Sequence, residues 1–282
     1  MLRISSRDLE PVSLGELTNL QSVVDAETDY PLQVELAKKL WKEKLNTNVR
    51  KALFGKVRET LADMSVGCVR CAYCEDSLAD EIEHILPKSF LPSLTFVWEN
   101  YLFACGPCNG PKNNRYGIIA NGALEEIIRK TNDLVVAPTL GPSALINPRS
   151  EDPMKYLELD LGGVTSNGTV LAATFQFVIR DNIQPEDEVR AKFTIEVLGL
   201  NREVIRVARQ NAFGGFRARL KEYVVEAKSG GADDLLDTLR QDILKAPHIT
   251  VLSEMMRQNI YLPEIKRLID EVPHTLYWAL TK

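Results

Sequence analysis

The sequence contains two Cys-x-x-Cys pairs with thirty residues between them, made of Cys71, Cys74, Cys105 and Cys108. Four thiolates at this spacing suit one tetrahedral zinc ion, and a zinc ion held by four thiolates has no open coordination position. The pattern therefore predicts a structural zinc site that contributes folding energy to a loop-rich segment. A fifth cysteine, Cys68, is expected to be a spare thiol, although its even spacing from Cys71 and Cys74 leaves the choice of ligands ambiguous.

The loop that the two pairs enclose contains a second group with chemical potential, the dipeptide Glu83-His84. Imidazole near its ordinary pKa is a natural base for activating water at neutral pH. On a strand, two neighbouring side chains face opposite sides, so the carboxylate and the imidazole could perform different tasks. A lone histidine is more often structural than catalytic, so the residue type alone leaves both interpretations open.

Polar residues around the second cysteine pair strengthen the case for chemistry. If a helix begins near Cys108, Asn109, Lys112 and Asn113 lie on one of its faces. An asparagine oxygen beside a carboxylate suits a hard divalent cation such as Mg²⁺. On this face, Lys112 would supply positive charge for a phosphate.

The stretches IEHILPKS, WENYLFACGPCN and PKNN resemble the HNH endonuclease family, whose fold is the ββα-metal finger. The resemblance implies that His84 is the general base and that Glu83 is a metal-ligating acid. It also implies that Asn100 pins the loop, that Asn109 is the last metal ligand and that Lys112 lies near the scissile phosphate. Glu83 and Asn109 would then bind the catalytic metal, with Asn113 as an alternative to Asn109.

The same resemblance implies an Mg²⁺- or Mn²⁺-dependent endonuclease, with DNA as the expected substrate. A weaker likeness in INPRSEDP and LGLNREVIRVAR extends to bacterial HNH proteins of anti-phage systems such as Septu and certain retrons, which often act beside an ATPase subunit. Two alternatives stay open. One is a ribonuclease on the same scaffold, and the other is a noncatalytic zinc module that binds nucleic acid or a partner protein.

Three regions must position these residues. We expect a basic helical region at 1–65, an HNH core with its zinc knuckles at 66–150, and a short β-hairpin followed by helices at 151–282. Residues 35 to 58 contain eight lysines and arginines against two glutamates, and their apolar residues recur at helical spacing. The predicted fold class is α+β, a ββα-metal HNH finger with a structural four-cysteine zinc inside a mainly helical protein.

Charge and hydropathy narrow the classes of function. The net charge of −5 argues against a protein that coats nucleic acid nonspecifically. It does not exclude a nuclease, because the binding of a phosphate depends on the local charge. No apolar run approaches the roughly 20 residues that cross a bilayer, and the N-terminus lacks a secretory signal, so we expect a cytoplasmic protein. Substrate-binding candidates are Lys112, Arg115 and a helical stripe of Arg202, Arg206 and Arg209, for which a solvated helix face is the alternative.

Overall fold

The computed structural model describes residues 1–278, so the last four residues of the predicted C-terminal region lie outside it. Its N-terminal part is helical: α1 (Pro11–Asp25), α2 (Tyr30–Lys42) and α3 (Asn48–Asp63). Asp29 and Thr47 cap α2 and α3, because the side chain of each accepts a hydrogen bond from a backbone N–H of the first turn. The buried residues Leu53, Phe54, Val57 and Leu61 of α3 recur at helical spacing, as the sequence pattern predicted.

The central part contains two strands and a helix. Strand β1 (Glu81–His84) pairs antiparallel with β2 (Tyr101–Ala104), so that His84 lies opposite Tyr101. Two short 3₁₀ turns, η1 (Pro92–Leu94) and η2 (Trp98–Asn100), lie between the strands. Helix α4 (Gly106–Lys112) follows β2 directly and begins two residues before Cys108. The chain order of this unit is therefore β, β, α.

The position of Asn113 differs from the expectation of one shared helix face. Helix α4 ends at Lys112, and Asn113 is the residue after it, with a left-handed φ of 37°. Asparagine tolerates positive φ better than most residues, which explains its use at this turn. Asn109 and Lys112 therefore share α4, whereas Asn113 does not.

A hairpin that the sequence analysis did not predict follows α4. It consists of β3 (Tyr116–Ala120) and β4 (Ala123–Ile127), joined by Asn121-Gly122. Both turn residues have positive φ, 52° and 78°, and Asn-Gly is the strongest short hairpin signal in a sequence. The sequence therefore contained the signal for this hairpin.

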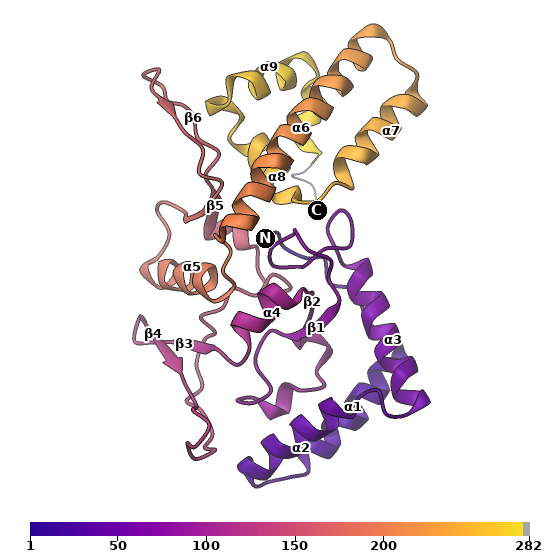
Figure 1. Cartoon of the computed structure of the whole chain (residues 1–282), viewed down its shortest axis with the longest axis vertical. Helices are drawn as coiled ribbons and strands as arrows, with labels where there is room; N and C mark the ends of the chain where they lie inside the picture. Colours follow the sequence, from indigo (N-terminus) through magenta and orange to yellow (C-terminus); the bar gives the residue numbers. More distant parts are fainter. Residues whose placement is uncertain (279–282) are drawn as a thin grey trace.

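The expected short hairpin in the third region forms two small ladders. Strand β5 (Leu157–Leu159) pairs with β8 (Phe177–Ile179), and β6 (Gly163–Val164) pairs with β7 (Val170–Leu171) between them. The 3₁₀ turn η3 (Pro153–Lys155) precedes β5. In Figure 1 the β6 hairpin extends away from the rest of the molecule.

Helices form the remainder of the described chain. They are α5 (Pro185–Val197), α6 (Glu203–Ser229), α7 (Asp233–Leu244), α8 (Ile249–Arg257), η4 (Asn259–Tyr261), α9 (Pro263–Glu271) and η5 (Pro273–Tyr277). Helix α5 begins at Pro185, after the strands of the third region, and Gly230 caps α6 with a φ of 77°.

The central ββα unit lies between the two helical parts (Figure 1). One hydrophobic cluster of buried residues runs from α1 to α9 through β1 and β2. The protein is thus a mixture of helices and small two-stranded sheets. Within residues 1–278, no helix combines the length and the apolar character that a membrane span requires.

Candidate active site and metal centre

The four cysteines of the two pairs converge on one point. Their sulfur atoms all lie within 4.8 Å of one another, and all four residues are buried. The Cys74 and Cys105 sulfurs are 3.8 Å apart, which is too long for a disulfide. A ZnS₄ tetrahedron with Zn–S bonds of about 2.3 Å has S–S edges of about 3.8 Å. The donor set and its spacing therefore fit a structural zinc ion.

The structure also resolves the ambiguity over Cys68. Cys68 is partly exposed and does not belong to the cluster, whereas Cys71 does. The turn after Cys71 is closed by a hydrogen bond from the Glu75 N–H to the Cys71 carbonyl, with Glu75 at a left-handed φ of 61°. The structure therefore gathers Cys71 and Cys74, and not Cys68, with the second cysteine pair.

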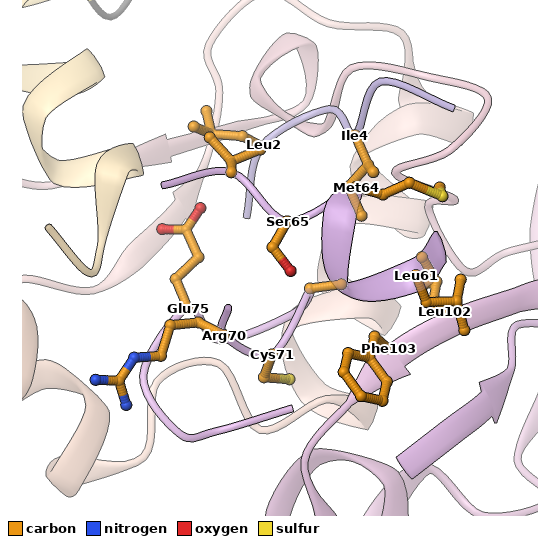
Figure 2. A pocket seen from close by; sticks show the side chains of 12 residues that line it. Leu2, Ile4, Leu61, Met64, Ser65, Arg70, Cys71, Glu75, Leu102 and Phe103 are labelled. Carbon is orange, nitrogen blue, oxygen red and sulfur yellow. The ribbon is translucent and has the colours of Figure 1, made fainter. Parts of the chain in front are cut away.

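Beside Cys71 lies a cavity of about 30 Å³, a volume that holds no more than about one water. Figure 2 shows Leu2, Ile4 and Met64 around one end of it and Cys71 with Phe103 at the other. The cavity marks the seam along which the N-terminal segment and the end of α3 pack onto the first cysteine pair. It is too small for a substrate.

Strand β1 presents its two faces to different neighbours. Glu83 faces α4: the Lys112 Nζ lies 2.5 Å from its Oε1, an ion pair whose angle is poor for a hydrogen bond. The same ammonium donates a hydrogen bond of 2.7 Å to the His84 carbonyl. Glu83 is only 4 % exposed, and burial raises the pKa of its carboxyl, while the charge of Lys112 opposes this rise.

This arrangement corrects the expected role of Lys112. Its side chain is 0 % exposed and is engaged by Glu83 and the β1 backbone, so it does not present a charge on the helix surface. A phosphate could reach Lys112 only by displacing these partners. Lys112 is placed to hold Glu83.

Asn109 lies against an acid that the sequence analysis did not single out. Its Nδ2 donates a hydrogen bond of 2.6 Å to Oε2 of Glu81. Glu81 stands two residues before Glu83 on β1, so strand alternation places both carboxylates on the α4 side. The Oδ1 of Asn109 accepts no hydrogen bond from the described residues. The α4 face of β1 thus carries two carboxylates and a nearby amide oxygen, a set of hard oxygen donors suited to Mg²⁺ or Mn²⁺.

His84 faces the opposite side, towards α2. Its ring centroid lies 4.2 Å from that of Trp41 and 5.3 Å from that of Tyr101. The His84 Nε2 is 2.9 Å from the Thr95 carbonyl. A carbonyl can only accept, so Nε2 carries the proton and Nδ1 carries the lone pair.

The environment keeps this imidazole neutral. Burial lowers the pKa of His84 well below its usual range, and the positive charges of Lys88, Lys112 and Lys44 lower it further, against the hydrogen bond to Thr95. In residues 1–278, Nδ1 has no hydrogen-bond partner. His84 is therefore a neutral base with a free lone pair at pH 7.

Asn100 pins the loop between β1 and β2. Its Oδ1 accepts from the Leu86 N–H at 2.8 Å, and its Nδ2 donates to the carbonyls of Leu86 and Leu94 at 2.9 and 3.0 Å. A residue that the sequence analysis missed secures Asn100 from outside. The buried Arg149 donates hydrogen bonds to the carbonyls of Trp98 and Tyr101, on either side of Asn100.

The expected arginine stripe on α6 is only partly exposed, because Arg209 is buried and Arg202 and Arg206 are half-buried. Arg209 is 2 % exposed, lies over the Phe177 ring at 4.3 Å and donates to the Phe175 carbonyl. Arg202 donates to the Pro107 carbonyl and, at 3.3 Å, to the Cys108 sulfur. The side of α6 with these two residues packs towards the zinc knuckle, so the buried Arg209 is not available to a phosphate, whereas a phosphate contact by the partly exposed Arg202 stays a prediction.

The remaining candidates also have other partners. Arg115 forms ion pairs with Glu126 and Glu196, which tie β3 to β4 and α5. Arg206 is partly buried, and its Nε has no hydrogen-bond partner among the described residues. The aromatic residues of α6 belong to the core: Phe216 and Tyr223 are buried, and Phe213 packs against Phe175.

The fold and the site define a mixed α and β protein with a ββα unit beside a buried four-cysteine cluster that fits a structural zinc ion. No family model matches the chain. Over 87 residues the chain is 34% identical to the Septu protein PtuB of Bacillus thuringiensis, a stretch that covers 29% of this chain and 32% of that protein. The chain thus spans about a third of the length of this curated relative. The predicted likeness to Septu proteins is confirmed over that stretch.

Proposed function

We propose that the protein is a metal-dependent endonuclease of the HNH type, which hydrolyses phosphodiester bonds in nucleic acid, with DNA as the expected substrate. One observation carries the proposal: a single ββα unit presents a neutral imidazole on one side of β1 and hard oxygen donors on the other. A general base and oxygen donors for a metal ion are the two kinds of group that activate water at a phosphate, provided that both reach the same phosphate.

Each residue has a task that follows from its geometry. Glu83 and Asn109 would hold Mg²⁺ or Mn²⁺, with Glu81 orienting the Asn109 amide. When bound, such an ion neutralises charge that develops on the phosphate and on the leaving oxygen. His84 accepts a proton from the attacking water at Nδ1, because the Thr95 carbonyl fixes the proton on Nε2.

Supercoiled plasmid and structured RNA, each incubated with the purified protein and Mg²⁺, test the proposal. His84→Ala should lower the cleavage rate by about 10²-fold or more, the range for a lost general base. His274→Ala is the matched control, since that exposed imidazole bonds Tyr223 far along the chain. EDTA should abolish cleavage by the wild type.

Zinc content and melting temperature must be equal in the two variants for the comparison to hold. Cleavage by His84→Ala at the wild-type rate would exclude it as the base, and undiminished activity in EDTA would exclude the metal. Cleavage of RNA alone would establish the ribonuclease alternative.

The similarity to a Septu protein supports a role in anti-phage defence, and we propose that the protein acts there in the cytoplasm beside an ATPase subunit. Free thiols persist in that compartment, as the four-cysteine cluster requires. Phage plating on bacteria that carry the complete system, with wild-type or His84→Ala protein, measures this role. Equal protection by the wild-type and the His84→Ala protein would show that defence does not depend on catalysis by His84. Co-purification from the same bacteria would identify the partner.

A further inference from the structure

On the α2 side of His84, one tryptophan packs against the imidazole and two lysines lie over that tryptophan. Trp41, near the end of α2, packs against the imidazole with 4.2 Å between the ring centroids. Two ammonium groups lie over the Trp41 ring, that of Lys44 at 4.6 Å from its centroid and that of Lys88 at 5.6 Å. Lys44 follows α2 and Lys88 follows β1, so two separate segments bring their charges to one indole.

These two cations are gathered without a counter-charge. Within the described part of the chain, neither Lys44 nor Lys88 forms an ion pair, and Glu83, the acid that most affects Lys88, is already paired with Lys112. Burial lowers the pKa of both lysines, and neighbouring positive charges lower each of them further. Like charges held together at a partly buried position destabilise a fold unless an anion joins them.

The indole explains how the two charges stay close. A cation over a tryptophan ring is attracted by the ring quadrupole, and the attraction is stronger when the cation is partly desolvated. Because Trp41 already contacts His84 and both ammonium groups, it is not free to stack on a nucleobase. The cluster therefore suits a phosphate group rather than a base.

We propose that Lys44 and Lys88, held on Trp41, form a seat for a phosphodiester group beside the one that is cleaved. The proposal rests on the proposed function, because it gives the nuclease its backbone contact. The lysines of the last turns of α2, Lys38, Lys39 and Lys42, are exposed, and the charge of Lys38 acts on Lys88. The seat would contact the sugar-phosphate backbone of the nucleic acid, so binding should not depend on the nucleotide sequence.

Anisotropy of a fluorescein-labelled duplex of about 20 base pairs, titrated with full-length protein in Ca²⁺, measures the seat. In Lys44→Gln/Lys88→Gln, Kd should rise about tenfold or more at about 50 mM salt, and the salt slope should fall by about two units, one for each lost phosphate contact. Lys44→Arg/Lys88→Arg keeps charge and ring contact and should restore binding.

Lys192→Gln/Lys245→Gln is the matched control, since it removes the same charge at exposed lysines on α5 and at the end of α7. It should leave the slope unchanged, as should a scrambled duplex sequence. Wild-type cleavage together with an unchanged slope in the Gln variant would overturn the seat alone. A wild type that neither binds nor cleaves nucleic acid would overturn both the seat and the nuclease.

Discussion

The contact between Lys112 and Glu83 sets two opposing effects on the pKa of a buried acid. Burial alone would favour the protonated carboxyl, and the ammonium 2.5 Å away opposes it. Such pairs add little net stability, but removing one partner leaves an uncompensated buried charge. The value of Lys112 therefore lies in the state of Glu83 rather than in the stability of the fold.

Lys112→Met should destabilise the zinc-loaded protein by about 3–5 kcal/mol, because Glu83 is left buried and unpaired. Adding Glu83→Gln to this variant should recover part of the loss without recovering cleavage. Urea unfolding of the wild type, the single variants and the double variant measures the coupling. If Lys112→Met keeps full stability but flattens the salt dependence of DNA binding, Lys112 contacts phosphate, as its helical spacing first suggested.

The Asn100 amide allows a second test by a change of one atom. Asn100→Asp keeps an acceptor for the Leu86 N–H but removes both hydrogen bonds to the carbonyls of Leu86 and Leu94. Each buried group left unsatisfied costs about 1–3 kcal/mol. Cleavage should fall with the zinc still bound, whereas the exposed Asn114→Asp should match the wild type. Normal cleavage by Asn100→Asp would show that the loop needs no pin.

At the scale of elements, Arg202 connects α6 to the zinc knuckle. With a zinc ion bound, the four thiolates and Zn²⁺ would carry a net charge of about −2, and the Arg202 guanidinium lies 3.3 Å from one of these sulfurs. Gly199, at a φ of 55°, allows this approach, because a Cβ there would stand 3.2 Å from the Arg202 Cδ. The turn between α5 and α6 is thus shaped around Arg202.

Arg202→Met should release zinc to a chelator about tenfold faster, the lower range for a lost hydrogen bond to a metal ligand. Arg202→Lys should lie between it and the wild type. With Co²⁺ in place of zinc, the sulfur-to-metal charge-transfer band should shift in Arg202→Met, which a general loosening of the fold would not produce. Arg217→Met, farther along α6, is the control. Identical release rates and spectra would contradict the contact.

The sequence predicted the cysteine cluster because Cys-x-x-Cys spacing is itself the geometry of the site. Strand alternation likewise predicted opposite faces for Glu83 and His84. It could not place Lys112 or Arg209, since helical spacing defines a face but not what covers that face. Arg202 of α6 contacts the sulfur of Cys108, and Lys112 contacts the β1 backbone. Both contacts join segments that are far apart in the chain.

At the scale of the whole molecule, the candidate site is built by all three predicted regions. The first contributes Trp41, the second contributes the ββα unit and Arg149, and the third contributes Arg202. Only the stretch around the ββα unit carries the motif that the resemblance to HNH nucleases rests on. The segments around Arg149 and Arg202, which carry the weaker likeness, both contact the ββα unit. Arg149 donates hydrogen bonds to the carbonyls beside Asn100, and Arg202 donates to the Pro107 carbonyl of α4.

His248 joins the C-terminal helices to the first cysteine pair, and its titration should be visible in the stability of the whole protein. His248 lies at the start of α8, and its Nε2 is 3.2 Å from the Oδ1 of Asp76. Burial lowers the pKa of His248 below the ordinary 6.5, although Glu75 and Asp76 oppose this. The unfolded chain therefore takes up the proton first as pH falls, so stability is full above about pH 6.5 and declines below it.

His248→Asn should weaken this decline, because asparagine tolerates the left-handed φ of 61° and does not titrate. Between about pH 7 and about pH 5.5, the free energy of unfolding should fall less steeply in the variant, by up to about 1.4 kcal/mol per pH unit. Acid loss of zinc and the lowered pKa of His84 act on both proteins, so the difference between the two curves isolates His248. Parallel curves from denaturant unfolding at fixed zinc would show that His248 does not link the C-terminal helices to the pH response.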